Sequence, residues 1–303
     1  MTLLSDQAED IRALVESADP GAVWAVGGPE GVHAASAGRG LGGSADTAVF
    51  PDDRGGEDTT ATVRAPGDGL GGSADTAVFP DDRGGEDTTA TVRAPGDGGG
   101  GGAAPGDLDV GGLATVLALW PALGSLVAEG ALQLHTPLTA YGDTTSAPGT
   151  TAHHLLTHPE GTAALTRLAE SLAGTSLAEL AATRVWQPLG MTRTRFADGT
   201  LRAPLTDLVR FPCHLLAQDG PGVSPAWTAE SLRIRTGELT PARGLLWHPA
   251  PHGVWAHHAP AADAPALWVA PRLRRWAVLL PASAHTPVRT AFREAAFTPA
   301  PAG

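Results

Sequence analysis

Histidines are the side chains best suited to chemistry in this sequence, and they occur in two groups. In the first, His153, His154 and His158, the last two are four residues apart, so a helix would place them on one face. The second group is looser and contains His248, His252, His257 and His258. The HxxxH spacing lacks the glutamate of a zinc protease. A metal site is therefore a minor alternative in both groups, and we expect neither metal nor cofactor.

Nucleophiles are harder to find. Cys213 is the only cysteine, which excludes an intramolecular disulfide, and it lies in an apolar helix predicted over residues 208–216. We expect a buried, inert thiol there. No G-x-S-x-G elbow occurs, and no base is recognisable near the serines Ser36, Ser44, Ser73 and Ser125. The sequence has no lysine and no asparagine, and Tyr141 is its only tyrosine. This scarcity of residues with AT-rich codons is typical of a bacterium with a GC-rich genome.

Charge and hydropathy exclude several classes of partner. The 303 residues carry a formal net charge of −12, which argues against nucleic acid and anionic membranes as partners. The N-terminus is acidic and lacks the apolar run of a signal peptide. No stretch reaches the roughly 18 apolar residues of a membrane span. We expect a cytoplasmic protein.

A tandem repeat interrupts the chain. Residues 41–69 are repeated without change at 70–98, and a glycine run follows at 98–102. Each copy carries a net charge of −4 and offers few apolar residues, so stacking as a solenoid is excluded. We predict a disordered insert over 41–105, since such a composition cannot bury a core. A calcium loop is a minor alternative, because the aspartate spacing fits no EF-hand.

The remaining sequence, 1–40 and 106–303, has the pattern of one folded domain. Apolar spacing and capping signals predict helices at 6–17, 110–129, 162–173 and from the capping box of Ser176 and Glu179 to Val185. Short apolar runs predict strands at 23–26, 267–269 and 276–280, the last two forming a hairpin, and a final helix begins at Thr286. We expect an α/β (α+β) fold whose antiparallel sheet combines strands from both chain ends, flanked by helices, with a helical region inserted.

Several segments carry a family resemblance. They are PGAVWAVG at 20–27, residues 120–141, HLLTH at 154–158, GTSLAELAATRVWQPLGMTRTRF at 174–196, LTDLVRF at 205–211 and the hairpin at 266–285. The segment at 174–196 is the most specific. Together they resemble the serine β-lactamase and penicillin-binding protein family, in its class C-like branch with D-alanyl-D-alanine peptidases and esterases. The resemblance implies a β-lactamase/transpeptidase-like fold.

The family's chemistry depends on a serine at the start of a buried helix and a lysine three residues later, one turn on. In the matching segment of this chain, Gly112 stands in place of the serine and Thr115 in place of the lysine. Glycine has no nucleophilic atom. A threonine hydroxyl cannot take up a proton near neutral pH as a lysine amine with a lowered pKa can.

Two further motifs of the family are altered. Tyr141 falls in the turn before the HLLTH segment rather than in a Y-x-N loop, and that loop looks deleted. His258 stands where the resemblance places the histidine of an H-x-G strand, but Pro260 replaces the glycine and has no N–H to offer a ligand.

We therefore expect a degenerate family member that is catalytically inactive, with motif positions Gly112, Thr115 and His258. One alternative is an active serine hydrolase with unrecognised catalytic residues. Another is a non-catalytic module that binds a small molecule in the vestigial cleft. The sequence leaves the oligomeric state open.

Overall fold

The structure is a computed structural model that describes residues 5–36, 106–158, 161–217, 220–236, 242–259, 261, 264–283 and 288–298, all within one compact unit. The repeats and the glycine run lie outside the described residues, so the disordered insert stays a prediction. None of the helices in these ranges is long and apolar enough to cross a bilayer.

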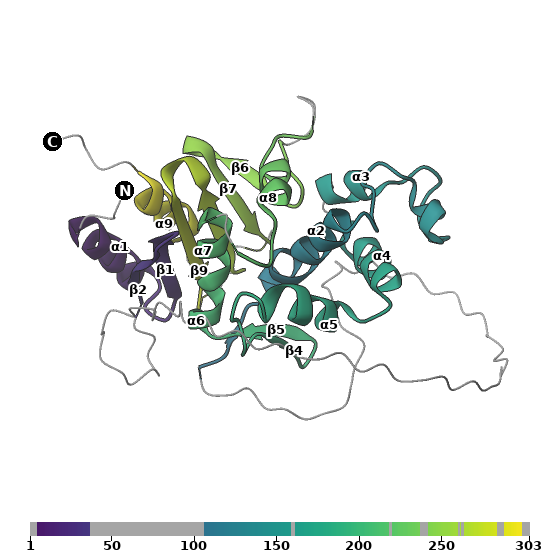
Figure 1. The fold of residues 1–303 in the computed structure, drawn as a ribbon. Coiled ribbons are helices and arrows are strands. Elements are labelled where there is room, and N and C mark those ends of the chain that lie inside the picture. The colour runs from purple at the N-terminus through teal and green to yellow at the C-terminus, as the bar shows by residue number, and fades with distance from the viewer. Residues whose placement is uncertain are drawn as a thin grey trace, which may run out of the picture. The chain divides into compact units, whose positions relative to one another are not determined.

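A six-stranded antiparallel sheet combines strands from both chain ends, as predicted (Figure 1). Its order is β2-β1-β9-β8-β7-β6. The strands are β1 (Val23–Gly28), β2 (Gly31–Ala35), β6 (His248–Ala250), β7 (Val254–His258), β8 (Ala266–Ala270) and β9 (Arg275–Leu280). Strand β1 pairs with β9, Val23 opposite Leu280, so the first strand closes onto the last. The predicted strand at 23–26 and the predicted hairpin are confirmed.

The helices α1 (Ser5–Ala18) and α9 (Val288–Phe297) cover one face of the sheet. Phe292 of α9 packs between Trp24 and Trp268, with ring centroids 6.0 and 5.8 Å away. Ile11 and Val15 of α1 are buried in the same cluster, so the predicted inward face of the first helix is confirmed. Burial of these three large aromatic side chains contributes strongly to the packing of α9 on the sheet.

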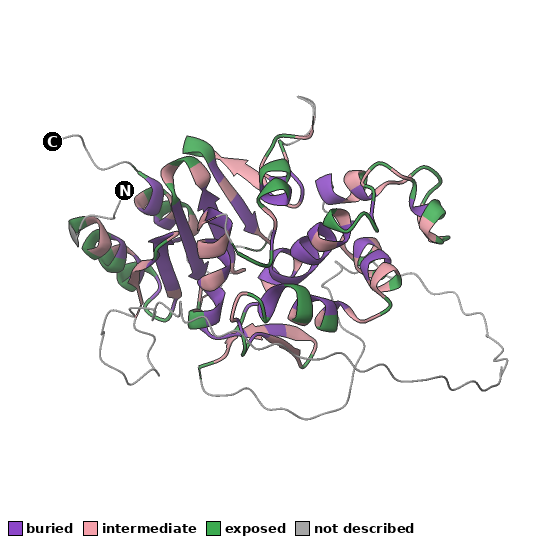
Figure 2. Ribbon diagram, in the orientation of Figure 1, coloured by how far each residue is buried: buried purple, intermediate pink, exposed green. Residues whose placement is uncertain are grey.

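The other face of the sheet packs against the helical region, and the strands between these layers are buried (Figure 2). This region contains the 3-10 turns η1 (Gly111–Leu113) and η3 (Leu138–Tyr141), the π-turns η2 (Thr115–Leu119) and η5 (Ala182–Trp186), and the helices α2 (Trp120–Ala128), α3 (Ala152–Thr157), α4 (Thr162–Ala173), α5 (Leu177–Ala181), α6 (Leu205–Leu208), α7 (Arg210–Ala217) and α8 (Pro225–Ser231). It lies between β2 and β6 in the sequence, as expected of an inserted helical region.

The predicted helix over 110–129 forms, but its first turns are irregular. Pro121 has no N–H, so it leaves the carbonyl of Leu117 without the usual partner four residues on. The indole of Trp186 donates to that carbonyl at 2.9 Å. The π-turn η2 precedes Pro121 and lets the chain continue into α2. A tertiary hydrogen bond thus replaces the one that proline removes.

Capping signals located the other helices well. Helix α4 spans the predicted residues and ends at Gly174, whose φ of 67° is the left-handed conformation that glycine adopts without strain. The capping box of Ser176 and Glu179 is present at α5. The helix predicted over 208–216 is confirmed as α7, which begins two residues later. Val209 separates α7 from the short α6, and Pro212 in the first turn of α7 cannot donate to the Leu208 carbonyl.

A second sheet of three short antiparallel strands was not predicted. It has the order β3-β5-β4, with β3 (Leu108–Asp109), β4 (Arg195–Ala197) and β5 (Thr200–Ala203). Two to four residues are too few to show an alternating pattern, so periodicity could not reveal these strands.

Candidate functional site

The structure brings Gly112 and Thr115 together on one short helical stretch. Gly112 lies in η1, which packs against β7 and β8, and Thr115 begins η2 three residues later. Leu113 between them is fully buried in the core that also holds Leu267 of β8. The two positions that the resemblance assigned to nucleophile and base therefore lie three residues apart beside the sheet. Neither carries the chemical group that acyl transfer needs.

The small sheet holds η1 in place. The Asp109 carboxylate accepts from the backbone N–H of Gly111 at 2.9 Å and from the Thr200 hydroxyl at 2.8 Å. A Cβ at Gly111 would lie 2.3 Å from the Thr200 hydroxyl oxygen, so a larger residue there would force the Thr200 side chain to move and would disturb its bond to Asp109. Just upstream, the buried carboxylate of Asp107 forms ion pairs with Arg193 and Arg195 of the 174–196 segment, at 2.8 and 2.6 Å.

Little room is left for a side chain at Gly112. A Cβ there would lie 3.0 Å from Cδ of Pro265, the residue before β8, and 3.6 Å from its nitrogen. Contacts of 3.0 Å are tighter than carbon atoms normally make, so a serine would require the proline ring to move by a few tenths of an ångström. The surroundings of Gly112 thus match glycine rather than the family's serine.

His258 does not face Gly112. Side chains alternate along a strand, and Val254 and Ala256 of β7 pack in the cluster formed with α1 and α9. His258 has the same parity and lies 3.3 Å from the guanidinium of Arg289 on α9. His258 therefore lies on the face of the sheet that α1 and α9 cover, whereas the resemblance aligned it with a motif that acts together with the positions of Gly112 and Thr115. A pair of adjacent histidines is ambiguous in sequence by one residue, and one residue reverses the face.

His257 is the histidine on the side of the helical region. Its ring packs edge-on against Trp247 with centroids 6.2 Å apart, and only 8% of the residue is exposed. Its Nδ1 donates to the carbonyl of Leu246 at 2.8 Å. Burial lowers the pKa of His257 to about 4, only partly opposed by the hydrogen bond to Leu246, so the imidazole is neutral at pH 7. Residue alternation along 254–258 was the signal that could have identified it.

The backbone of Leu246 connects β7 to the helical region. Its carbonyl accepts from His257, and its N–H donates to the carbonyl of Leu156 in α3 at 2.7 Å. Leu246 has a φ of 64°, a left-handed conformation that is unfavourable for leucine. The next residue, Trp247, is fully buried and packs against Trp120 of α2 with centroids 5.7 Å apart. The position of His257 is thus fixed by the Leu246 backbone, which bonds to α3, and by Trp247, which packs against α2.

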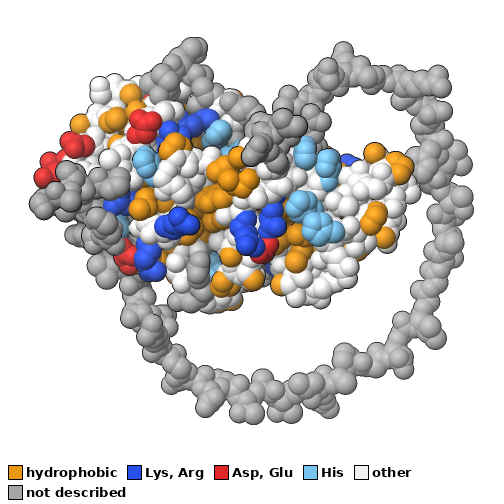
Figure 3. All heavy atoms as spheres, turned by 90° about the horizontal axis from the view of Figure 1, so that it is seen from above, with side chains coloured by type: hydrophobic (Ala, Val, Ile, Leu, Met, Phe, Trp, Pro, Cys, Tyr) orange, Lys and Arg blue, Asp and Glu red, His pale blue; other side chains and the backbone are white. Residues whose placement is uncertain are grey.

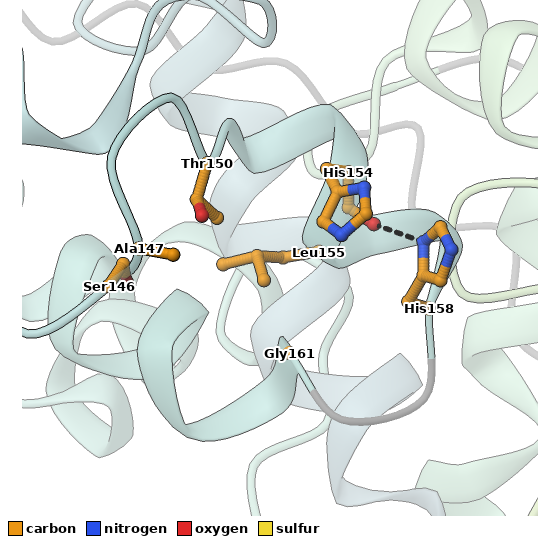
Figure 4. Close-up of a pocket in the computed structure, with 7 residues that line it drawn as sticks. All are labelled: Ser146, Ala147, Thr150, His154, Leu155, His158 and Gly161. Carbon is orange, nitrogen blue, oxygen red and sulfur yellow. Dashed lines mark hydrogen bonds between the residues drawn. The ribbon is translucent and has the colours of Figure 1, made fainter.

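Two histidines of the first group lie in α3 and at its C-terminal end. His154 and His158 stack with centroids 4.2 Å apart and line a hollow of about 360 Å³ beside Ser146 and Thr150 (Figure 4). Nδ1 of His158 bonds to the carbonyl of His154 at 2.8 Å, and the other ring nitrogen points away from Ser146 and Thr150 in Figure 4. The Ser146 hydroxyl donates to Asp143 rather than to a histidine. The hollow therefore holds no serine–histidine pair.

Other candidate groups also have structural partners. Burial raises the pKa of the Cys213 thiol to about 11, as expected of an unreactive cysteine. The hydroxyl of Tyr141 accepts from the backbone N–H of Gln133 at 2.8 Å, in the turn before α3. Within the described ranges, no three histidine, cysteine or acidic side chains are grouped to hold a metal ion.

Comparison with known proteins gives a fold but no close relative. No protein-family model matches the sequence, and the comparison with curated proteins finds no match. Among solved structures, a β-lactamase from Mycobacterium bovis has a TM-score of 0.56 at 18% identity, over 90% of this chain and 91% of the other. The hydrolase EstCE1, described as having promiscuous acyltransferase activity, has a TM-score of 0.58 at 10% identity, over 97% and 98% of the two chains.

A penicillin-binding protein homologue from Pyrococcus abyssi has a TM-score of 0.51 at 16% identity, and the match covers 61% of this chain and 64% of that protein. Identities this low show the fold alone. The mixed architecture, with its antiparallel sheet built from both chain ends, agrees with all three similarities. This chain has the fold of the β-lactamases and penicillin-binding proteins.

Proposed function

We propose that this β-lactamase-like protein does not carry out serine–lysine acyl transfer. The observation that supports the proposal is the residue content of η1 and η2: the resemblance aligns Gly112 with the nucleophile and Thr115 with the lysine, and neither residue has the required group. No lysine elsewhere can substitute, because the sequence contains none. Without a nucleophile the covalent acyl intermediate cannot form. Without an amine of lowered pKa, the proton of an attacking hydroxyl has no acceptor.

The imidazole of His257 is a poor replacement for the missing base. General bases act best when their pKa lies near the working pH, and the pKa of His257 is about 4. Its Nδ1 is also engaged by Leu246. The hydroxyl of Thr115, which is half-buried, could attack only if a base of this kind lay within hydrogen-bond reach, and no such bond is formed among the described residues.

Turnover and covalent labelling test the proposal. Purified wild-type protein is incubated with nitrocefin, with p-nitrophenyl acetate and with a fluorescent fluorophosphonate, beside an active serine β-lactamase as the positive control. We expect no turnover above buffer and no label on the wild-type chain. Label or turnover that survives further purification, and that disappears in Thr115→Val, would overturn the proposal and identify Thr115 as the nucleophile.

A restored variant tests whether the surroundings still suit the reaction. Gly112→Ser with Thr115→Lys supplies both missing groups, and Pro265→Ala added to this pair removes the ring that crowds position 112. We expect fluorophosphonate labelling of Ser at 112 to require all three changes. Equal labelling with and without Pro265→Ala would show that the proline does not obstruct this position.

A further inference from the structure

Three pairs of histidines have their rings against one another within the described ranges. The pairs are His135 with His153, His154 with His158, and His248 with His258, with ring centroids 4.7, 4.2 and 5.8 Å apart. Histidine side chains also gather on the molecular face seen in Figure 3. Neutral imidazole is a preferred ligand of copper, nickel and zinc ions, so the surroundings of each pair decide whether it suits such an ion.

Arginines stand beside two of the three pairs. The Arg243 guanidinium lies 2.7 Å from Nε2 of His248, and the Arg289 guanidinium lies 3.3 Å from Nδ1 of His258. In the pair of His135 and His153, the positive charge of Arg235 acts on the His153 imidazole. A bound divalent cation would be repelled by these charges. The surroundings of both pairs therefore disfavour a metal ion.

The pair of His154 and His158 has different surroundings. Both residues are exposed, and their spacing of four residues places them on one side of α3. The only ring nitrogen of the pair that hydrogen-bonds to a described residue is Nδ1 of His158. It lies 2.8 Å from the carbonyl of His154 (Figure 4) and 3.1 Å from the hydroxyl of Thr157. Both ring nitrogens of His154 and Nε2 of His158 are therefore open to a ligand.

The bond to the His154 carbonyl prepares His158 as a metal ligand. A carbonyl only accepts, so Nδ1 carries the proton and Nε2 of the neutral ring has the free lone pair that a metal ion requires. Metal-binding histidines commonly donate their other ring N–H to a backbone carbonyl in this way, which fixes the tautomer and the orientation of the ring.

Room remains for the other parts of a coordination shell. Imidazole nitrogens bind these metals at about 2 Å, so two of them on one ion lie about 3 Å apart. His158 is held by its bonds, and the exposed ring of His154 can turn to reach that spacing. The hollow of about 360 Å³ beside the two rings can hold water ligands. At its rim, Asp143 and Arg167 both contact Thr145, so this part of the rim carries one charge of each sign.

We propose that His154 and His158 together bind one divalent transition-metal ion of the class that prefers imidazole, namely Cu²⁺, Ni²⁺ or Zn²⁺. Nε2 of His158 is one ligand, a ring nitrogen of His154 is the second, and water fills the other positions. The glutamate of a zinc protease motif is not needed for this, since that residue is a base in the reaction rather than a ligand. The site is independent of acyl transfer, because it includes neither Gly112 nor Thr115.

Nickel chloride is the probe, because Ni²⁺ binds imidazole strongly and undergoes no redox change here. It is titrated by calorimetry at pH 7.5 into the full-length protein without a histidine tag. We expect one Ni²⁺ ion per chain, removed by a chelator. His154→Gln and His158→Gln should each weaken binding about tenfold or more, since loss of a ligand costs at least as much as loss of a group that orients one.

A matched control separates this pair from the other histidines. His135→Gln removes an imidazole from the neighbouring pair and should leave Ni²⁺ binding unchanged. Thermal unfolding checks that each variant is folded. A second readout needs no variant: in the wild-type protein, Ni²⁺ below one equivalent should broaden the imidazole NMR signals of His154 and His158 before those of the other histidines.

Four results would overturn the proposal. They are the absence of saturable Ni²⁺ binding, binding that survives unchanged in either His154→Gln or His158→Gln, a loss in His135→Gln as large as in those two variants, and broadening that begins at other histidines. Each of the last three would assign the ion to another part of the chain.

Discussion

The buried imidazole of His257 makes the stability of this protein depend on pH. The pKa of His257 is about 4 in the folded chain against an ordinary value of 6.5, so between these values the unfolded chain binds a proton that the folded chain does not. Stability linked to this group is complete above pH 6.5 and is lost as pH falls towards 4. Over the whole window the loss is about 3 kcal/mol, and at pH 5 it is about 2 kcal/mol.

Urea unfolding followed by tryptophan fluorescence at pH 7.5 and pH 5.0 measures this loss. The histidines His153, His248 and His258 also have lowered pKa values and add to the wild-type loss in the same direction. The informative quantity is therefore the difference from His257→Gln, whose amide can donate to the Leu246 carbonyl but does not titrate. We expect the free energy of unfolding to fall by about 2 kcal/mol less in the variant than in the wild type between these pH values.

An equal loss in both proteins would refute the reasoning, because it would mean that His257 is protonated in the fold or that its carbonyl partner stabilises the charged form. An NMR titration of the wild-type protein provides the direct check. The His257 signal should stay that of a neutral ring down to pH 5.

Three further outcomes follow from named contacts. Trp120→Phe should lower the free energy of unfolding by about 2 kcal/mol more than Trp247→Phe does. The Trp120 indole donates to buried Ser231 at 2.9 Å, whereas the buried indole N–H of Trp247 has no partner among the described residues. Urea unfolding of the two variants measures the difference, and equal losses would contradict the prediction. Gly244→Ala should lower the free energy of unfolding by about 1–3 kcal/mol, because the added Cβ would overlap the Ser231 carbonyl oxygen, at 2.1 Å. An unchanged urea midpoint would show that the backbone around Gly244 moves freely. Cys213 should react with a maleimide at pH 8 far more slowly in the native protein than in urea, and equal rates would contradict its raised pKa.

Local patterns were enough to predict most of the helices and the pairing of the chain ends. The serine of the capping box and Gly174 mark helix ends through bonds to their own neighbours in sequence, so no tertiary information is needed to find them. Two short apolar runs joined by a basic turn likewise indicated the β8–β9 hairpin, because both features are local in sequence. Proline was the main local signal left unused: Pro121 and Pro212 each remove a helical hydrogen bond, and the chain is irregular just before α2 and just before α7.

Some features of the candidate site also follow from the sequence alone, and others depend on the tertiary structure. The absence of lysine and the glycine at position 112 are properties of the sequence, and no fold can supply an amine or a hydroxyl that the chain lacks. Which of two adjacent histidines faces the helical region depended on the register between β7 and β8, with His257 opposite Leu267, and this is a tertiary property. The pKa of His257 and the crowding of Gly112 by Pro265 likewise depend on groups far apart in sequence, because burial and packing are set by distance in space.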